Sequence, residues 1–264
     1  MPTFNALDKP SSSAPPNRDR LLTIYGRKPV LEALQDSTIN PTRLHLANSN
    51  RTHGIVAQIE AAATARQIDV RRHDRQALSR ISKNGRQDQG VALDIECPRF
   101  DALTHHLKQH TGRQRLLVLD GITNPQNVGM IIRSAVAAGI DGIVIPKRGV
   151  AAIGPLVIKA SSGTIFRAPL LTCGDIEHAL TELRTHQVAL ITLAGDAKES
   201  LFDYQPAERI AMILGSETDG VSIATQAQTD HTLRIPMESN VESLNVAVTA
   251  ALVSYHLRHG LTPG

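Results

Sequence analysis

The sequence predicts an α/β protein: a parallel β-sheet with helices on both faces, preceded by a smaller α/β domain. In the second half of the chain, continuous apolar runs such as residues 116–119 and 210–214 alternate with helical patterns. Such runs are typical of strands that are buried on both faces of a parallel sheet. In the first half, short strand and helix patterns alternate over about 80 residues, which favours a small layered domain.

Four segments follow from these patterns. Residues 1–20 lack periodicity around a Ser-Ser-Ser-Ala-Pro-Pro stretch, so we expect a disordered leader. The first domain is predicted over residues 21–97 and a linker over 98–113. The second domain is predicted over residues 114–264.

Within the first domain, apolar residues at helical spacing predict helices over residues 26–35, 54–65 and 75–81. Strands are predicted over residues 42–47, 68–70 and 91–95. The linker contains a helix-like stretch over residues 101–109.

The second domain is predicted to begin with a strand over residues 115–120. A helix over 128–138 follows, with Gly139 as its C-cap. The remaining expected strands cover residues 142–145, 188–193, 209–214 and 232–235, and the remaining helices cover 175–185 and 244–258.

Basic charge is concentrated in the first domain. Residues 1–114 carry 17 Lys and Arg against 11 Asp and Glu, whereas residues 115–264 carry 11 against 14. A basic cluster over residues 66–86 suits a polyanion such as RNA, through phosphate contacts and counterion release. A solvated basic face is the alternative. The candidate RNA-binding residues are Arg27, Arg71, Arg72, Arg75 and Arg86.

Several function classes are disfavoured. The chain has no Gly-x-Gly-x-x-Gly turn and no Gly-x-x-x-x-Gly-Lys-Ser/Thr loop, so a dinucleotide enzyme or a P-loop hydrolase is not indicated. Cys97 and Cys173 stand alone, so we expect neither a disulfide framework nor a metal site. The apolar runs are too short to cross a bilayer. We therefore expect a soluble cytoplasmic protein.

Three motifs follow apolar strand-like runs. They are Asn-Pro-Gln-Asn-Val-Gly at 124–129 with Arg133 beyond it, the glycine-containing segment 214–222, and Ile-Pro-Met at 235–237 leading to Ser-Leu-Asn-Val at 243–246. Ligands of open α/β sheets bind beyond the carboxyl ends of strands. The glycines of the second motif would let the backbone approach a flat ligand closely or adopt a positive φ.

Together, the three motifs resemble those of the TrmH (SpoU) branch of the SPOUT methyltransferases. Residues 24–33 resemble the opening of the L30e-like domain that precedes the methyltransferase domain in some members. The resemblance implies a trefoil-knotted domain, a homodimer and S-adenosylmethionine as cofactor. It also implies methyl transfer to a ribose 2'-hydroxyl of RNA, without a metal.

Candidate site residues follow from the resemblance, in two sets. The catalytic set is Asn127, Arg133, Glu217, Ser243 and Asn245. The cofactor set is Leu193, Ala194, Gly195, Leu214, Gly215, Gly220, Ile235, Met237, Ser243 and Leu244.

Roles for three of these residues can be argued from their chemistry. A guanidinium is hard to deprotonate, so Arg133 is expected to bind a substrate phosphate and to stabilise charge at the attacking oxygen, in its own or a partner subunit's site. Asn127 would position the arginine or the ribose. Ser243 is a favoured N-cap type before an apolar stripe, at Leu244, Val248, Ala251, Leu252 and Tyr255, that we expect to form core and dimer surface.

The full first domain favours rRNA as the substrate, and a guanosine in large-subunit (23S-type) rRNA is the preferred target. The alternatives are a tRNA ribose methyltransferase, a base-methylating SPOUT enzyme, and a non-catalytic RNA-binding or ribosome-assembly protein of the same fold. Two positions depart from the family motif: Ser239 stands where a glycine is frequent, and Ala247 where a second serine is frequent. These departures affect the expected loop shape and substrate fit.

Overall fold

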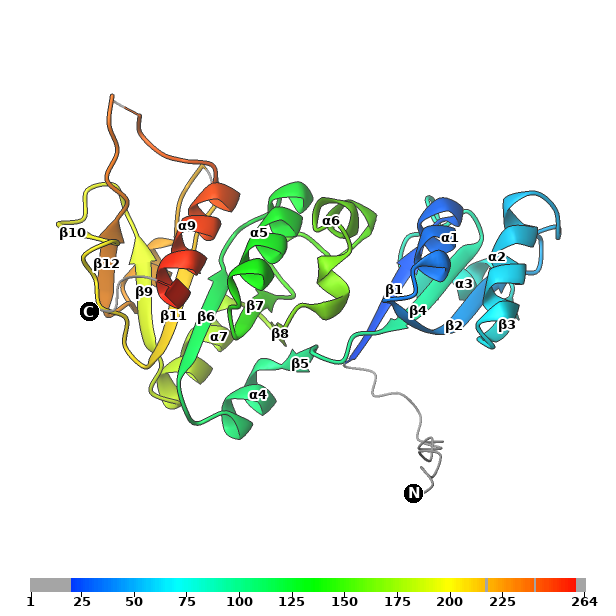
Figure 1. Ribbon diagram of the computed structural model, residues 1–264, viewed down its shortest axis with the longest axis horizontal. Helices are drawn as coiled ribbons and strands as arrows, with labels where there is room; N and C mark the ends of the chain where they lie inside the picture. Colours follow the sequence, from blue (N-terminus) through cyan, green and yellow to red (C-terminus); the bar gives the residue numbers. More distant parts are fainter. Residues whose placement is uncertain (1–19, 217, 240, 260–264) are drawn as a thin grey trace, which may run out of the picture.

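The computed structural model describes residues 20–216, 218–239 and 241–259, which form two β-sheets (Figure 1). A four-stranded sheet has the order β1-β4-β2-β3, and an eight-stranded sheet has the order β10-β12-β9-β11-β6-β7-β8-β5. All neighbouring strands of the larger sheet are parallel. The α/β class and the parallel sheet predicted from the sequence are therefore confirmed. The predicted leader, residues 1–20, lies outside the described residues except for Arg20.

The smaller sheet mixes strand directions, because β1 and β2 both pair antiparallel to β4 while β2 pairs parallel to β3. Its elements match the predicted helices and strands within three residues at either end, but the first strand was not predicted. They are β1 (Leu21–Tyr25), α1 (Arg27–Gln35), β2 (Asn40–Ala47), α2 (Ile55–Ala65), β3 (Asp69–His73), α3 (Arg75–Ser82) and β4 (Val91–Glu96).

The larger sheet is covered on both faces, as the continuous apolar strands require. Along β6, Leu117 and Leu119 pack in the same core as α5 and α9, whereas Leu116 and Val118 pack with α4 and α7. Successive strand residues point to opposite faces, so both sets can be apolar. The elements that carry predicted motifs are β6 (Gln114–Leu119), α5 (Pro125–Ala138), β9 (Ala189–Leu193), β11 (Arg209–Leu214), β12 (His231–Arg234) and α9 (Val246–His259). Gly139 ends α5 with φ 83°, as predicted for a left-handed C-cap.

Several short elements escaped prediction because they span too few residues to show periodicity. They are α6 (Pro155–Ala160), the 3₁₀ turn η2 (Thr164–Arg167), β8 (Leu170–Cys173), β10 (Glu199–Ser200) and α8 (Ile223–Gln226). The predicted β7 (Gly142–Pro146) and α7 (Ile176–Thr185) complete this part of the fold. In Figure 1, α6 lies on the side of the larger sheet that faces α1.

The segment 98–113 belongs structurally to the larger sheet. β5 (Asp101–Ala102) pairs with β8, and α4 (Leu103–Gln109) buries Leu103 and Leu107 in the core with α7. Only a short stretch after β4 therefore joins the two sheets without pairing. Among the described residues, no helix has the length and apolar character needed to span a bilayer.

Candidate active site

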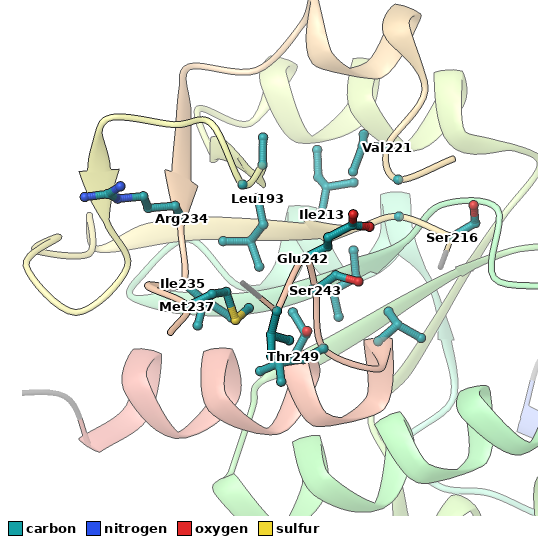
Figure 2. Close-up of a pocket in the computed structure, with 18 of the residues that line it drawn as sticks. Leu193, Ile213, Ser216, Val221, Arg234, Ile235, Met237, Glu242, Ser243 and Thr249 are labelled. Carbon is teal, nitrogen blue, oxygen red and sulfur yellow. The ribbon is translucent and has the colours of Figure 1, made fainter. Parts of the chain in front are cut away.

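A cavity of about 370 Å³ lies at the carboxyl ends of β9, β11 and β12 (Figure 2). Its walls come from the loops after these strands and from the start of α9. All ten residues of the predicted cofactor set line it: Leu193, Ala194, Gly195, Leu214, Gly215, Gly220, Ile235, Met237, Ser243 and Leu244. The structure thus brings together residues that lie up to 51 positions apart in the sequence.

Gly215 is required by the closure of its own loop. A Cβ atom built on Gly215 would lie 2.1 Å from the carbonyl carbon of Gly220 and 2.2 Å from the nitrogen of Val221. Two backbone hydrogen bonds between Ser216 and Gly220, of 2.9 and 3.0 Å, close the loop. Gly220 has φ +66°, a conformation that side chains rarely adopt. The loop therefore depends on both glycines, and the positive φ expected in this motif occurs at Gly220.

Asp120 anchors this loop from the end of β6, and sequence reasoning missed it. Asp120 is 8% exposed, and its carboxylate accepts hydrogen bonds from the Thr225 hydroxyl at 3.0 Å and from the Ser222 backbone N–H at 3.4 Å. Thr225 itself is fully buried. Asp120 directly follows an apolar strand and precedes the first motif, which is the one sequence signal that could have identified it.

Polar side chains line the cavity as well as apolar ones. Figure 2 shows Arg234 beside Ile235 and Met237, with Glu242 and Ser243 coming from the following segment and Thr249 from α9. Arg234, Ser216, Glu242 and Thr249 were not predicted from the sequence. Loop backbone, apolar side chains and a few polar groups suit a ligand such as S-adenosylmethionine, which combines a flat base, a ribose and a charged amino-acid tail. A Cβ built on Gly195 would meet nothing within 4 Å, so a ligand can approach the backbone there.

Two of the predicted catalytic residues touch each other. Asn127 lies on α5, is 4% exposed, and its Oδ1 accepts a hydrogen bond of 3.3 Å from Nδ2 of Asn245. The Oδ1 of Asn245 accepts from the backbone N–H of Ala247 at 2.9 Å. Asn245 is therefore the N-cap of α9. The prediction that Ser243 caps this helix was wrong, because the helix begins three residues later, at Val246.

The apolar stripe predicted on this helix, as core and dimer surface, lies outside the face that α9 buries in its own chain. The buried face of α9 carries Val246, Ala250, Val253 and Leu257. Val248 and Tyr255 of the predicted stripe are each 49% exposed. When a helix carries apolar residues on several faces, their periodicity does not show which face is buried.

Arg133 lies away from the cavity of its own chain. Its side chain is exposed, does not line the cavity, and donates a hydrogen bond of 3.2 Å from Nη1 to the Ser162 hydroxyl. Gly129, one turn earlier on α5, lets α6 pack closely, because a Cβ there would lie 2.5 Å from the Cβ of Ala160. The remaining predicted catalytic residue, Glu217, lies outside the described residues.

The predicted RNA-binding arginines lie in the domain that contains the smaller sheet. Arg71 and Arg72 are exposed on the edge strand β3, where they pair with Asp69 at 2.9 Å and Glu60 at 2.5 Å. Arg75, at the first position of α3, and Arg86, after that helix, are exposed too.

Two further arginines of this domain, Arg27 and Arg66, have local partners. Arg27 donates to the carbonyl of Gln89 at 3.3 Å and to Asn50 at 3.2 Å. Arg66 belongs to the basic cluster in sequence but donates to three backbone carbonyls, those of Leu34, Asp36 and Ile39. Arg66 therefore stabilises the end of α1 and is not free to bind a polyanion.

Neither cysteine is poised for chemistry. Burial raises the pKa of Cys97 to about 12 and that of Cys173 to about 11, so both stay protonated thiols. Within the described ranges, no group of three His, Cys, Asp or Glu side chains is arranged to hold a metal ion.

Comparisons with known proteins agree with this architecture. Residues 114–255 match the SpoU rRNA methylase family, and residues 23–100 match the RNA 2'-O ribose methyltransferase substrate-binding family. The relative from Xylella fastidiosa strain Temecula1, named 23S rRNA (guanosine-2'-O-)-methyltransferase RlmB, is 37% identical over 236 residues, which cover 88% of this chain and 94% of the relative. The protein of the same name from Xanthomonas axonopodis pv. citri is 33% identical over 235 residues, with the same coverage.

Solved structures show the same fold. The SpoU methyltransferase AviRb from Streptomyces viridochromogenes, solved with AdoMet, superposes with a TM-score of 0.61 at 20% identity and covers 90% of this chain and 89% of its own. The match spans both sheets. The chain belongs to the SpoU rRNA methylase family.

Proposed function

We propose that this protein transfers a methyl group from S-adenosylmethionine to the ribose 2'-hydroxyl of a guanosine in 23S-type rRNA. The observation that carries the proposal is the cavity at the carboxyl ends of β9, β11 and β12. Residues of the second and third motifs line it, and the first motif contacts the third through the hydrogen bond between Asn127 and Asn245. The two relatives described above are named for this reaction, and each matches about nine-tenths of this chain.

The reaction joins the ribose oxygen to the methyl carbon while the carbon–sulfur bond of the cofactor breaks. The electron pair of that bond stays on sulfur, and the hydroxyl proton is released to solvent. The cofactor supplies an electrophilic methyl on a sulfonium when bound. The loop held by Gly215, Gly220 and Asp120 would hold it by backbone contacts. Orientation of two bound reactants lowers the barrier by several kcal/mol without further chemistry. Asn127 and Asn245 would position the ribose or the arginine that acts on it.

Arg133 is proposed to act in the cavity of a partner subunit. Its exposed side chain does not line the cavity of its own chain. The exposed Val248 and Tyr255 of α9 and Met130 of α5 provide an apolar surface on the two helices that pack together. A homodimer would bury this surface, bring Arg133 to the second cavity, and let it bind a substrate phosphate. The trefoil knot implied by the family resemblance remains a prediction.

Complementation tests the shared site. Arg133→Ala and Gly215→Val chains, each inactive alone, are expected to regain part of the activity when they are unfolded together and refolded as mixed dimers. A mixture that stays as inactive as its components would show that Arg133 serves its own chain.

The function is tested by transfer of labelled methyl to unmodified total RNA, followed by separation of the ribosomal and transfer fractions. Label in a ribose of 23S rRNA is the expected result, and it protects the adjoining phosphodiester from alkaline cleavage. Label in a ribose of tRNA would show that the protein is a ribose methyltransferase with tRNA as its substrate. Label on a base would indicate a base methyltransferase. RNA binding without cofactor binding or transfer would favour a non-catalytic RNA-binding protein. An rRNA substrate agrees with the cytoplasmic location predicted from the sequence.

A further inference from the structure

A second cavity, of about 360 Å³, lies at the opposite edge of the larger sheet. Its wall includes Gln114, the first residue of β6, Asp141 just before β7, and Pro169 just before β8. Parallel strands begin at this edge and end at the edge that carries the first cavity. Because β6 is six residues long, the two cavities are separated by roughly 20 Å of sheet.

Three arginines converge on this cavity from three parts of the chain. Arg20 precedes β1, Arg99 lies in the stretch that joins the two sheets, and Arg113 precedes β6. All three are exposed, and within residues 20–216, 218–239 and 241–259 none of their guanidinium groups forms a hydrogen bond or an ion pair. Two carboxylates also line the cavity, and each has a partner other than these arginines: Asp101 pairs with His105 at 2.7 Å, and Asp141 accepts from the backbone N–H of Arg115 at 2.8 Å.

The cavity wall also holds a buried polar side chain with an unused acceptor. Gln114 is 2% exposed, and its amide nitrogen donates to the His110 carbonyl at 2.9 Å. Its Oε1 has no hydrogen-bond partner among the described residues. The rings of His106 and His110 stack beside it with centroids 4.2 Å apart. An occupant that suits this wall carries negative charge for the guanidinium groups and a hydroxyl or amine donor for Gln114.

We propose that this cavity binds the ribose-phosphate backbone of RNA at a point remote from the methylated nucleotide. Guanidinium forks match phosphate oxygens, and unpaired arginines gathered around one cavity repel each other until an anion neutralises them. A ribose 2'-hydroxyl supplies the donor that Gln114 lacks, which also distinguishes RNA from DNA. The occupant's identity as RNA rests on the proposed function. The site would hold the RNA at the junction of the two sheets while the target nucleotide reaches the first cavity.

The test compares the full-length Arg99→Ala/Arg113→Ala variant with wild type, with unmodified 23S rRNA and 5'-GMP as probes at several salt concentrations. RNA affinity is expected to fall about tenfold. The slope of log affinity against log salt should fall in magnitude by about one, because about one phosphate contact is lost. Cofactor affinity and turnover at saturating RNA stay unchanged. Arg99→Lys/Arg113→Lys keeps the charge, so it should retain most of the salt slope but lose part of the affinity with the guanidinium fork.

Lys108→Ala/Arg148→Ala is the matched control, since it removes the same charge from two exposed side chains that do not line the cavity. An equal loss of RNA affinity in this control, or no loss in the arginine variant, would overturn the proposal. Loss of 5'-GMP binding with unchanged RNA affinity would overturn it in favour of a free-nucleotide site. If wild type methylates no RNA but the arginine variant still binds RNA more weakly than the control, the site stands and the proposed function fails.

Discussion

The side-chain amide of Asn245 connects two helices that start 121 residues apart: it caps α9 through its Oδ1 and donates to Asn127 of α5 through its Nδ2 at 3.3 Å. One side chain thus sets both the start of the C-terminal helix and the orientation of a second predicted catalytic residue. The first and third motifs meet at this contact.

Asn245→Ser and Asn245→Ala separate these two roles. Serine retains an N-cap oxygen but cannot donate as the amide does, so we expect near-normal stability and reduced methyl transfer. Alanine removes the cap as well, and the free energy of unfolding should fall by a further ~1 kcal/mol. Urea denaturation and turnover with saturating cofactor measure the two effects. Equal turnover in wild type and Asn245→Ser would show that the contact with Asn127 is only structural.

Arg133→Ala is expected to abolish methyl transfer while leaving cofactor binding and stability near the wild-type values. The side chain is exposed and touches Ser162 through a single hydrogen bond, so its removal leaves no buried group unpaired. Calorimetric titration measures cofactor binding, and a single-turnover assay measures methyl transfer. Arg148→Ala removes another exposed arginine and should transfer methyl normally. Normal methyl transfer by Arg133→Ala would show that Arg133 takes no part in catalysis.

Gly215→Ala should disrupt the loop that lines the cavity at the ends of β9, β11 and β12. The added Cβ would lie 2.1 Å from backbone that cannot move without opening the loop, and overpacking of this kind typically costs about 1–3 kcal/mol. We expect weaker cofactor binding and a lower melting temperature. Gly112→Ala is the control, because a Cβ there would meet nothing within 4 Å. Unchanged cofactor affinity in Gly215→Ala would mean that this loop does not hold the cofactor.

Charge reversal at Arg71, Arg72 and Arg75 should weaken RNA binding and flatten its dependence on salt, because fewer phosphate contacts release fewer counterions. The ion pair of Arg72 with Glu60 is on the surface, so the triple variant should lose little stability. Filter binding over a range of salt concentrations gives both affinity and slope. If both match those of wild type, the exposed edge of β3 is a solvated face.

Stability should fall as the pH is lowered from about 6.5 to about 4 because of His106. Burial, followed by the neighbouring His110, lowers the pKa of His106 from 6.5 to about 4. In that window the unfolded chain binds a proton at this histidine and the folded chain does not, so protonation favours unfolding. His106→Gln should lose less stability between pH 7 and pH 4.5 than wild type in urea titrations. His259→Gln, at the exposed end of α9, should behave like wild type, and identical pH profiles for all three proteins would contradict the assignment.

The sequence by itself determined most elements and the edge of the sheet at which the predicted cofactor residues gather. Continuous apolar runs identify buried parallel strands, and segments that follow such strands gather at one edge of the sheet. For that reason the ten predicted cofactor residues line one cavity, although their spacing in the sequence does not predict the position of each residue. Gly139 and Gly220 were likewise predictable, because their roles are local backbone conformations.

Only the tertiary structure decided the features that depend on contacts between distant parts of the chain. Asn245 rather than Ser243 caps α9, since helix packing sets the first turn. Asp120 reaches Thr225 across 105 residues of sequence. Arg20, Arg99 and Arg113 surround one cavity because strand order brings three chain segments together. Local patterns encode which residues prefer burial or a turn, whereas the choice of partner depends on how the whole sheet assembles.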